Sequence, residues 1–242
     1  MAFAVTNTGN VKTRVTTRLF GSAPDIAVTP KNTAPASSTG GGVVFKPGQY
    51  VTFPGTGLTS ASGPYIDFGA QTVSLGSSGV SIKVTFMFTA YNTSGVASDN
   101  QRLVDFNTGA NGVNNLILTK VAGTNNLMFA YRNGSGTQQS VTTTGFAFEN
   151  GVVYTVVAIY NPNIGSTGQL SIYAASGNRV GVTPLVTSTP SVKATSSFTY
   201  TTTYIGRSSY STDQSLIAQI YSLGVYKRIL GLRGVRGNDL IA

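Results

Sequence analysis

Apolar and polar residues alternate in short runs along the chain, a pattern that predicts β-strands. The clearest run is 81–91. Its apolar face consists of Ile82, Val84, Phe86 and Phe88. Its other face consists of Lys83, Thr85, Met87 and Thr89. Because this second face is half polar, we expect it to be exposed in part.

Other runs are separated by turn signals rich in Gly, Asn and Pro. They predict strands at 11–20, on both sides of Lys46-Pro47-Gly48 within 43–53, as a pair within 65–75, and at 102–106, 116–121, 126–132, 138–143, 151–160 and 168–174. No segment has convincing helical periodicity. The pattern therefore predicts an all-β, two-sheet antiparallel jelly-roll sandwich.

Residues 203–230 predict the closing pair of strands. The first ends at Ile205, residues 206–214 form a polar loop, and the second begins at Ser215. Apolar residues fall on both faces of the second strand, with Leu216, Ala218 and Ile220 on one and Ile217, Leu223 and Val225 on the other. We expect a central strand that is covered on both faces near its middle.

The run 43–53 resembles the F-x-G-x-x-Y-V opening of laminin-G-like and concanavalin A-like jelly-roll domains, a kind also found in viral structural proteins. Gly48 matches the glycine of that motif and Pro47 precedes it. Lys46 and Gln49 stand where acidic residues are usual.

Later segments are similar to further motifs of the same domains. Residues 152–156 occupy the position of the motif W-Y-H-V-A-x-x-Y, with valine in place of tryptophan and Thr155 in place of histidine. Residues 169–177 match the motif G-x-x-x-x-Y-V-N-G and keep its tyrosine as Tyr173. Residues 204–207 match x-I-G, and 217–230 resembles the closing motif with Gln219 in place of an acid. The resemblance covers 43–232 and implies the fold. It does not imply one function, because this fold serves lectins, adhesion modules, glycosidases and viral structural proteins.

The composition divides the chain into three parts. Residues 1–42 predict an extended basic N-terminal arm, 43–232 the jelly-roll domain, and 233–242 a C-terminal tail. The basic residues assigned to the arm are Lys12, Arg14, Arg18 and Lys31. Because termini of this composition are ordered only when something holds them, we expect the arm to lie on its own domain or on neighbouring subunits.

The residue inventory argues against an enzyme. The chain has no cysteine, histidine or tryptophan, and Glu149 is its only glutamate. It therefore lacks thiol nucleophiles, the commonest general base and the commonest metal ligand. The absence of cysteine fits a reducing compartment or a virion. No cofactor is expected.

Two kinds of binding site can be considered. A calcium site would use several oxygen ligands, and its candidates are Asp99, Asp105 and Asp213. No two carboxylates lie within three residues of each other, so these acids are interpreted as turn-forming or solvated, and no metal is predicted. A shallow glycan site would use the loops 91–101, 107–115 and 208–214, with Tyr210 as a stacking platform and Asp213 beside it. The same residues also suit any exposed β loop.

The leading hypothesis is a non-enzymatic structural protein of a large assembly, a minor capsid or decoration protein of a virion. Its partners would be other capsid subunits, reached by an arm that adds backbone hydrogen bonds to an exposed sheet edge. The alternative is a lectin-like carbohydrate-binding module that recognises surface glycans, at an extracellular or cell-surface location. The net charge is +9, but no nucleic-acid motif accompanies it. No run of about 18 apolar residues predicts a membrane span, and residues 1–42 do not have the pattern of a secretory signal peptide.

Overall fold

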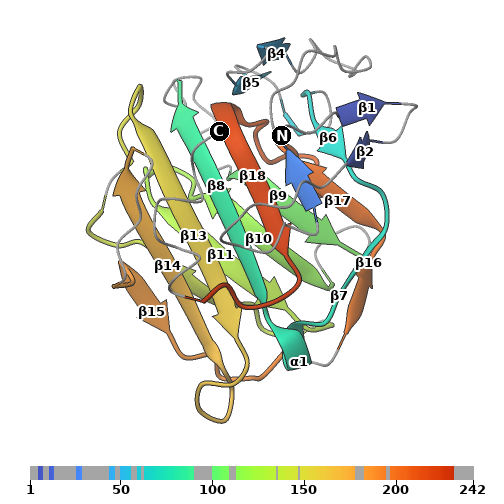
Figure 1. Cartoon of the computed structure of the whole chain (residues 1–242), viewed down its shortest axis with the longest axis vertical. Coiled ribbons are helices and arrows are strands. Elements are labelled where there is room, and N and C mark those ends of the chain that lie inside the picture. The colour runs from blue at the N-terminus through green and yellow to red at the C-terminus, as the bar shows by residue number, and fades with distance from the viewer. Residues whose placement is uncertain are drawn as a thin grey trace.

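The structure of the protein is a computed structural model. It describes residues 5–7, 11–13, 26–28, 44–46, 50–55, 59–60, 63–89, 100–108, 113–134, 136–146, 148–177, 183–194 and 197–231, the first four of these ranges by their backbone alone. Two antiparallel sheets face each other across a common core (Figure 1). This is the sandwich that the alternating pattern predicts.

The first sheet has six strands in the order β12-β11-β10-β9-β17-β6. Their bounds are β6 (Ile66–Asp67), β9 (Gln101–Asn107), β10 (Asn115–Lys120), β11 (Leu127–Arg132), β12 (Gln139–Thr142) and β17 (Thr202–Ile205). Strands β9 to β12 follow one another both along the chain and across the sheet. They correspond to the strands predicted at 102–106, 116–121, 126–132 and 138–143, and they form a meander.

The second sheet has eight strands, seven of them in the order β15-β14-β13-β8-β18-β5-β4, with β3 paired to β18 off this path. Their bounds are β3 (Ile26–Val28), β4 (Val44–Lys46), β5 (Tyr50–Pro54), β8 (Val80–Phe88), β13 (Val153–Asn161), β14 (Gln169–Ser176), β15 (Val186–Ser188) and β18 (Ile217–Tyr226). β4 and β5 pair on either side of Pro47, so the two strands predicted there are confirmed.

Two small sheets and one short helix complete the described elements: β1 (Val5–Asn7) with β2 (Val11–Thr13), β7 (Gln71–Val73) with β16 (Phe198–Tyr200), and α1 (Leu75–Ser78). The predicted pairing within 65–75 is wrong. Both strands exist, but β6 pairs with β17 and β7 pairs with β16. Each bonds to a strand distant in sequence, and local pattern does not report such partners.

Aromatic side chains fill much of the space between the two sheets. Phe86 of β8 packs against Phe88, Phe148 and Tyr154, with ring centroids 4.7, 5.9 and 6.4 Å away. All four side chains belong to the main buried cluster, to which both sheets contribute. Burial of this apolar area is the main favourable contribution to folding.

Strand β18 is bonded to β8 on one side and to β5 and β3 on the other, as expected for a central strand. Its pairing with β8 shifts between Ile220 and Ser222, which makes Tyr221 the extra residue of a β-bulge. The bulge changes which positions face the core, from Ala218 and Ile220 before it to Leu223 and Val225 after it. Strict alternation therefore assigns the apolar residues of β18 to both faces. Because of the bulge, most of them nevertheless face the same core.

The second face of β8 is more buried than its half-polar pattern predicts. Lys83 and Thr85 are 6% and 4% exposed. The hydroxyl groups of Thr85 and Thr155 share a hydrogen bond of 3.0 Å across the β8–β13 pair. Farther along this sheet, Val157 and Ile159 pack against other apolar side chains in a second, smaller cluster. Toward the end of β8 this face opens to solvent, since Met87 is half-buried and Thr89 is exposed. The expectation of partial exposure is therefore confirmed, although Lys83 and Thr85 are buried.

Candidate functional site

The loop that joins β17 to β18 carries the predicted glycan-contact residues. We call residues 206–216 the crossover loop, because it leaves the six-stranded sheet and enters the eight-stranded one. It packs on β9, all of whose residues are buried. The buried polar residues of β9 are Gln101, Arg102, Asp105 and Asn107. Buried polar groups need partners, and the crossover loop supplies them.

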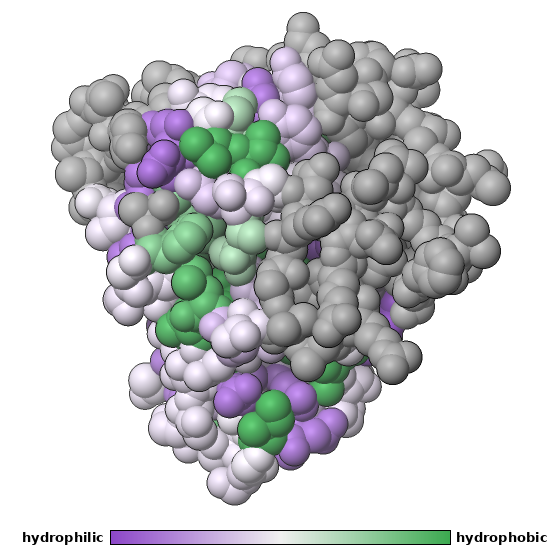
Figure 2. Space-filling view, turned by 60° about the vertical axis from the view of Figure 1, so that its left-hand side comes forward, coloured by the Kyte–Doolittle hydropathy of each residue, from purple (hydrophilic) through white to green (hydrophobic). Residues whose placement is uncertain are grey.

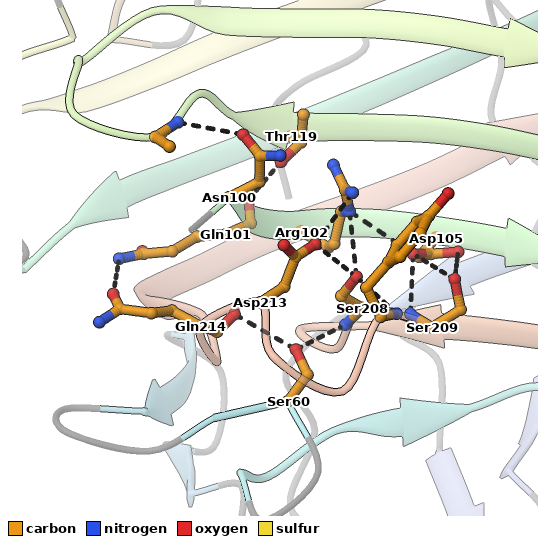
Figure 3. Close-up of polar contacts among 12 residues, drawn as sticks. Ser60, Asn100, Gln101, Arg102, Asp105, Thr119, Ser208, Ser209, Asp213 and Gln214 are labelled. Atoms are coloured by element: carbon orange, nitrogen blue, oxygen red, sulfur yellow. Dashed lines mark hydrogen bonds and ion pairs between the residues drawn. The ribbon is translucent and has the colours of Figure 1, made fainter. Parts of the chain in front are cut away.

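Arg102 is the centre of this contact (Figure 3). Its Nη2 lies 2.9 Å from Oδ2 of Asp213, and its Nε lies 3.5 Å from Oδ2 of Asp105. The Nε also donates a hydrogen bond of 3.4 Å to Oγ of Ser208. Arg102 is 4% exposed, so these ion pairs are weakly screened by solvent. One arginine therefore joins β9 to the far end of the loop.

A β-bulge in β9 makes this arrangement possible. Residues three apart on a regular strand point to opposite faces, yet Arg102 and Asp105 form an ion pair. The pairing of β9 with β10 shifts between Leu118 and Thr119, which leaves Leu103 as the extra residue. Leu103 and Val104 both join the core. The bulge thus lets Arg102 and Asp105 share the outer face of the sheet.

The remaining loop contacts are hydrogen bonds from serine and glutamine (Figure 3). Ser208 is held twice, since its Oγ donates to Asp213 at 2.6 Å and its N–H donates to Oγ of Ser60 at 3.0 Å. At the end of the loop, Nε2 of Gln101 donates to Oε1 of Gln214 at 3.2 Å. The loop is therefore fastened at both ends and across its middle.

Asp105 is the most deeply buried acid of the network, at 0% exposed. Burial raises the pKa of its carboxyl above the ordinary value of 3.8, while the guanidinium of Arg102 and the hydrogen bonds from Ser209 act in the opposite direction. The nearby charge of Asp213 raises the pKa further. Burial is the largest of these effects, so the pKa of the Asp105 carboxyl is higher in the folded protein than its ordinary value.

Asp105→Asn is expected to remove a pH dependence of stability. Because the pKa of Asp105 is raised in the folded state, protonation of its carboxyl stabilises the fold. This contribution is complete at pH values below the ordinary pKa of 3.8, and it is lost as the pH rises through the folded pKa. The unfolding free energy of the parent, minus that of Asp105→Asn, should therefore fall as the pH rises above about 4 and then level off. Denaturant unfolding at several pH values measures this difference. A difference that rises with pH would contradict the assignment.

The tip of the crossover loop is open to solvent. Ser211 and Thr212 are exposed and Tyr210 is half-buried. The ring of Tyr210 lies 5.8 Å from the guanidinium carbon of Arg102, and its N–H donates to Oγ of Ser208 at 3.0 Å. The predicted platform is thus accessible, and its backbone is hydrogen-bonded to the buried network. Asp213 instead directs Oδ2 inward to Arg102 and Ser208, so the structure places it as a support of the loop.

Two of the three candidate calcium ligands flank a cation that the protein itself supplies. Asp105 and Asp213 are both paired with Arg102. Asp99 lies outside the described residues. No group of three or more acids that could hold a metal ion occurs in the part of the chain that the structure describes.

The basic arm lies almost entirely outside the described residues. This holds for Arg14, Arg18 and Lys31, and Lys12 is described only by its backbone in β2. Near the arm's middle, β3 pairs with Leu223–Val225 of β18 in the same chain. This strand completes its own sheet, so the pairing gives no support to exchange with a neighbouring subunit.

A second cluster, which the sequence pattern does not predict, lies where the crossover loop begins. The guanidinium carbon of Arg207 lies 4.4 Å from the ring centroid of Tyr65 and 5.1 Å from that of Tyr204. The two rings meet edge to face at 5.2 Å. All three side chains are half-buried. Distances of this size are favourable for cation–π interactions.

This cluster borders the polar network on the outer face of the smaller sheet. Tyr204 is the direct cross-strand partner of Asp105 in the β17–β9 pair, so the two side chains share a face. Asp105 in turn contacts Arg102, above which Tyr210 lies. We call Tyr65, Tyr204, Arg207 and Tyr210 the tyrosine surface. Its members come from two segments, Tyr65 and the stretch 204–210, so the match of 204–207 to x-I-G does not reveal the cluster.

Comparison with known proteins identifies the fold. No protein-family model and no curated protein sequence matches the chain. Among solved structures, the binding domain of Paraclostridial mosquitocidal protein 1 is similar with a TM-score of 0.56 and 11% identity, over 82% of this chain and 45% of that one. A Trypanosoma rangeli sialidase in complex with 2,3-difluorosialic acid gives 0.50 and 16%, over 82% and 28%. The CBM40 of a Ruminococcus gnavus IT-sialidase, bound to α2,3 sialyllactose, gives 0.49 and 13%, over 72% and 96%.

At these identities the similarity shows the fold alone. The chain spans less than half of the first two of these structures. The described strands independently form two facing antiparallel sheets. The chain is therefore an all-β, two-sheet antiparallel jelly-roll sandwich.

Proposed function

We propose that the protein is a non-catalytic carbohydrate-binding module that contacts glycans through its tyrosine surface. The observation that carries the proposal is the set of half-buried tyrosines on a loop and strands fixed by a buried polar network. Tyrosine offers a rigid ring and a hydroxyl group at a small entropic cost. A support that is already ordered lowers the entropy lost on binding.

The similar structures are in keeping with this proposal. One is the binding domain of a mosquitocidal protein, and another belongs to a sialidase that was solved with a sialic acid derivative. They give no support to a role in a capsid or virion. We accordingly prefer the lectin-like hypothesis to the structural one, with surface glycans as partners and an extracellular or cell-surface location.

The surface of the described residues gives little sign of a large subunit interface. The large apolar side chains that are exposed are Val113, Ile164, Leu185 and Val192. On the face shown in Figure 2, apolar groups emerge as small separate areas between polar ones. Stable subunit interfaces use broader apolar patches.

In the part of the chain that the structure describes, no helix has the length and hydropathy of a membrane span.

A glycan array probed with the purified protein tests the proposal. We expect saturable binding to at least one glycan, and we expect Tyr210→Ala to weaken it about tenfold or more, as for a central aromatic contact. Tyr173→Ala is the matched control, because Tyr173 is a half-buried tyrosine that packs on the second apolar cluster of the other sheet. Absence of saturable binding, or an equal loss in the control, would refute the proposal.

A further inference from the structure

Arg207 carries a charge that its surroundings leave unpaired. The two ion pairs found among the described residues both belong to Arg102. Within the same residues, Arg207 has two tyrosine rings as neighbours and neither a hydrogen bond nor an ion pair. Its Nε is buried without a partner. A partly desolvated cation in this position gains more from an anionic partner than a fully hydrated one does.

The geometry decides which atoms of Arg207 a ligand can reach. Nε is enclosed, whereas Nη1 and Nη2 do not appear among the buried unpartnered atoms of the described residues and therefore face solvent. The rings of Tyr65 and Tyr204 fix the plane of the guanidinium. A planar guanidinium held in this way presents two parallel donors, which match the two oxygens of a carboxylate.

Tyr204 adds a second donor beside the guanidinium. Burial raises the pKa of its hydroxyl, with the charge of Arg207 acting in the opposite direction, so the phenol remains protonated at neutral pH. The nearby acid, Asp67, uses Oδ1 to accept the N–H groups of Gly69 at 2.8 Å and Thr203 at 3.5 Å. Asp67 is thus bonded to backbone rather than to Arg207.

We infer that Arg207 and Tyr204 form a carboxylate-binding subsite, which makes the protein selective for acidic sugars. The inference rests on the proposed carbohydrate binding and adds the class of sugar. The carboxylate of a sialic or uronic acid pairs with Nη1 and Nη2 of Arg207, and the Tyr204 hydroxyl donates to the same ligand. The sugar ring lies against the remaining surface of the two tyrosines.

Calorimetric titration with matched acidic and neutral sugars tests this subsite. One pair is 3′-sialyllactose and lactose, and the other is a disaccharide ending in glucuronic acid and its glucose-terminated counterpart. We expect at least one acidic member to bind about tenfold or more tightly than its neutral counterpart, because hydrogen bonds to charged groups are the stronger ones. The two pairs show whether the carboxylate comes from sialic or uronic acid.

The variant Arg207→Gln tests whether Arg207 causes the preference for acidic sugars. It should abolish the preference, so that the variant binds the acidic sugar no more tightly than its neutral counterpart. Arg207→Lys keeps the charge but not the planar fork and should restore only part of the preference. Arg228→Gln is the matched control, because Arg228 also stacks on a tyrosine, Tyr226, at 5.4 Å, and loses the same charge. Melting curves confirm that each variant is folded.

The possible outcomes separate the two proposals. If acidic and neutral sugars bind equally well, or if Arg207→Gln keeps the preference, the carboxylate subsite is refuted while carbohydrate binding stands. If the parent protein binds no sugar on the array or in the titrations, carbohydrate binding is refuted and the subsite with it. A loss of preference in Arg207→Gln but not in Arg228→Gln supports both.

Discussion

Replacing Arg102 with methionine is expected to lower the free energy of unfolding by about 3–5 kcal/mol, the usual cost of removing one partner from a buried ion pair. The side chain is 4% exposed and is bonded to Asp105, Asp213 and Ser208. Methionine fills much of the same space but leaves the two carboxylates without a cation. Denaturant unfolding at neutral pH measures the loss.

The pH dependence distinguishes this electrostatic cost from a simple packing defect. Without Arg102, burial and the nearby charge of Asp213 both favour the protonated form of Asp105. The stability lost in Arg102→Met should therefore be partly recovered as the pH is lowered toward 4, and also in the double variant Arg102→Met/Asp213→Asn. A loss that does not change with pH and is not rescued would indicate packing alone.

Arg132→Met is the control for the loss of a buried arginine charge. Arg132 lies in β11, is half-buried, and has no ion pair among the described residues. Its replacement should change stability by no more than about 1 kcal/mol, because no buried carboxylate is left behind. A loss of stability as large as that of Arg102→Met would show that the unpaired carboxylates of Asp105 and Asp213 do not cause the effect.

The sequence predicted the strands well because a strand buried on one face has a local signature. The alternation of Ile82, Val84, Phe86 and Phe88 needs no knowledge of the partner strands, and all four residues are 0% exposed. The meander from β9 to β12 was predictable for the same reason, since short turns connect strands that are adjacent in the sheet. These features depend on neighbours along the chain.

The two bulges were not predictable from alternation. A strict period of two places Arg102 and Asp105 on opposite faces, and the extra residue Leu103 reverses that expectation. In β18 the extra residue Tyr221 likewise moves the core positions onward by one. An added residue in a strand leaves no mark in composition, although it decides where the functional side chains point.

The candidate site could be predicted only in part. The sequence indicates Tyr210 as a platform, and the side chain is accessible, but its role in binding stays a prediction. The sequence also groups Asp213 with it as a contact, and only the structure reveals that Arg102 holds its carboxylate inward. The cluster of Tyr65, Tyr204 and Arg207 depends on pairing between β6 and β17, which are far apart in sequence. Such long-range contacts are set by topology.

Replacing Gly206 with alanine is expected to destabilise the protein by about 2–4 kcal/mol, the sum of a backbone penalty and a steric one. Gly206 has a φ of +84°, a region in which alanine is strained. A Cβ at this position would also lie 2.4 Å from Cδ1 of Phe53, which is fully buried in the core. The ring of Phe53 has no free space into which it can move without disturbing its neighbours.

The consequence for the tyrosine surface makes this variant informative about function. Gly206 lies between Ile205 of β17 and Arg207, so a displaced backbone there moves the guanidinium away from Tyr65 and Tyr204. Gly145→Ala is the matched control, because Gly145 has a φ of +85° and a Cβ added there would have no atom within 4 Å. The control should lose only about 1 kcal/mol. Equal losses in the two variants would show that contact with Phe53 does not position the crossover loop, whereas a larger loss in Gly206→Ala, together with weaker sugar binding by the folded variant, is the expected result.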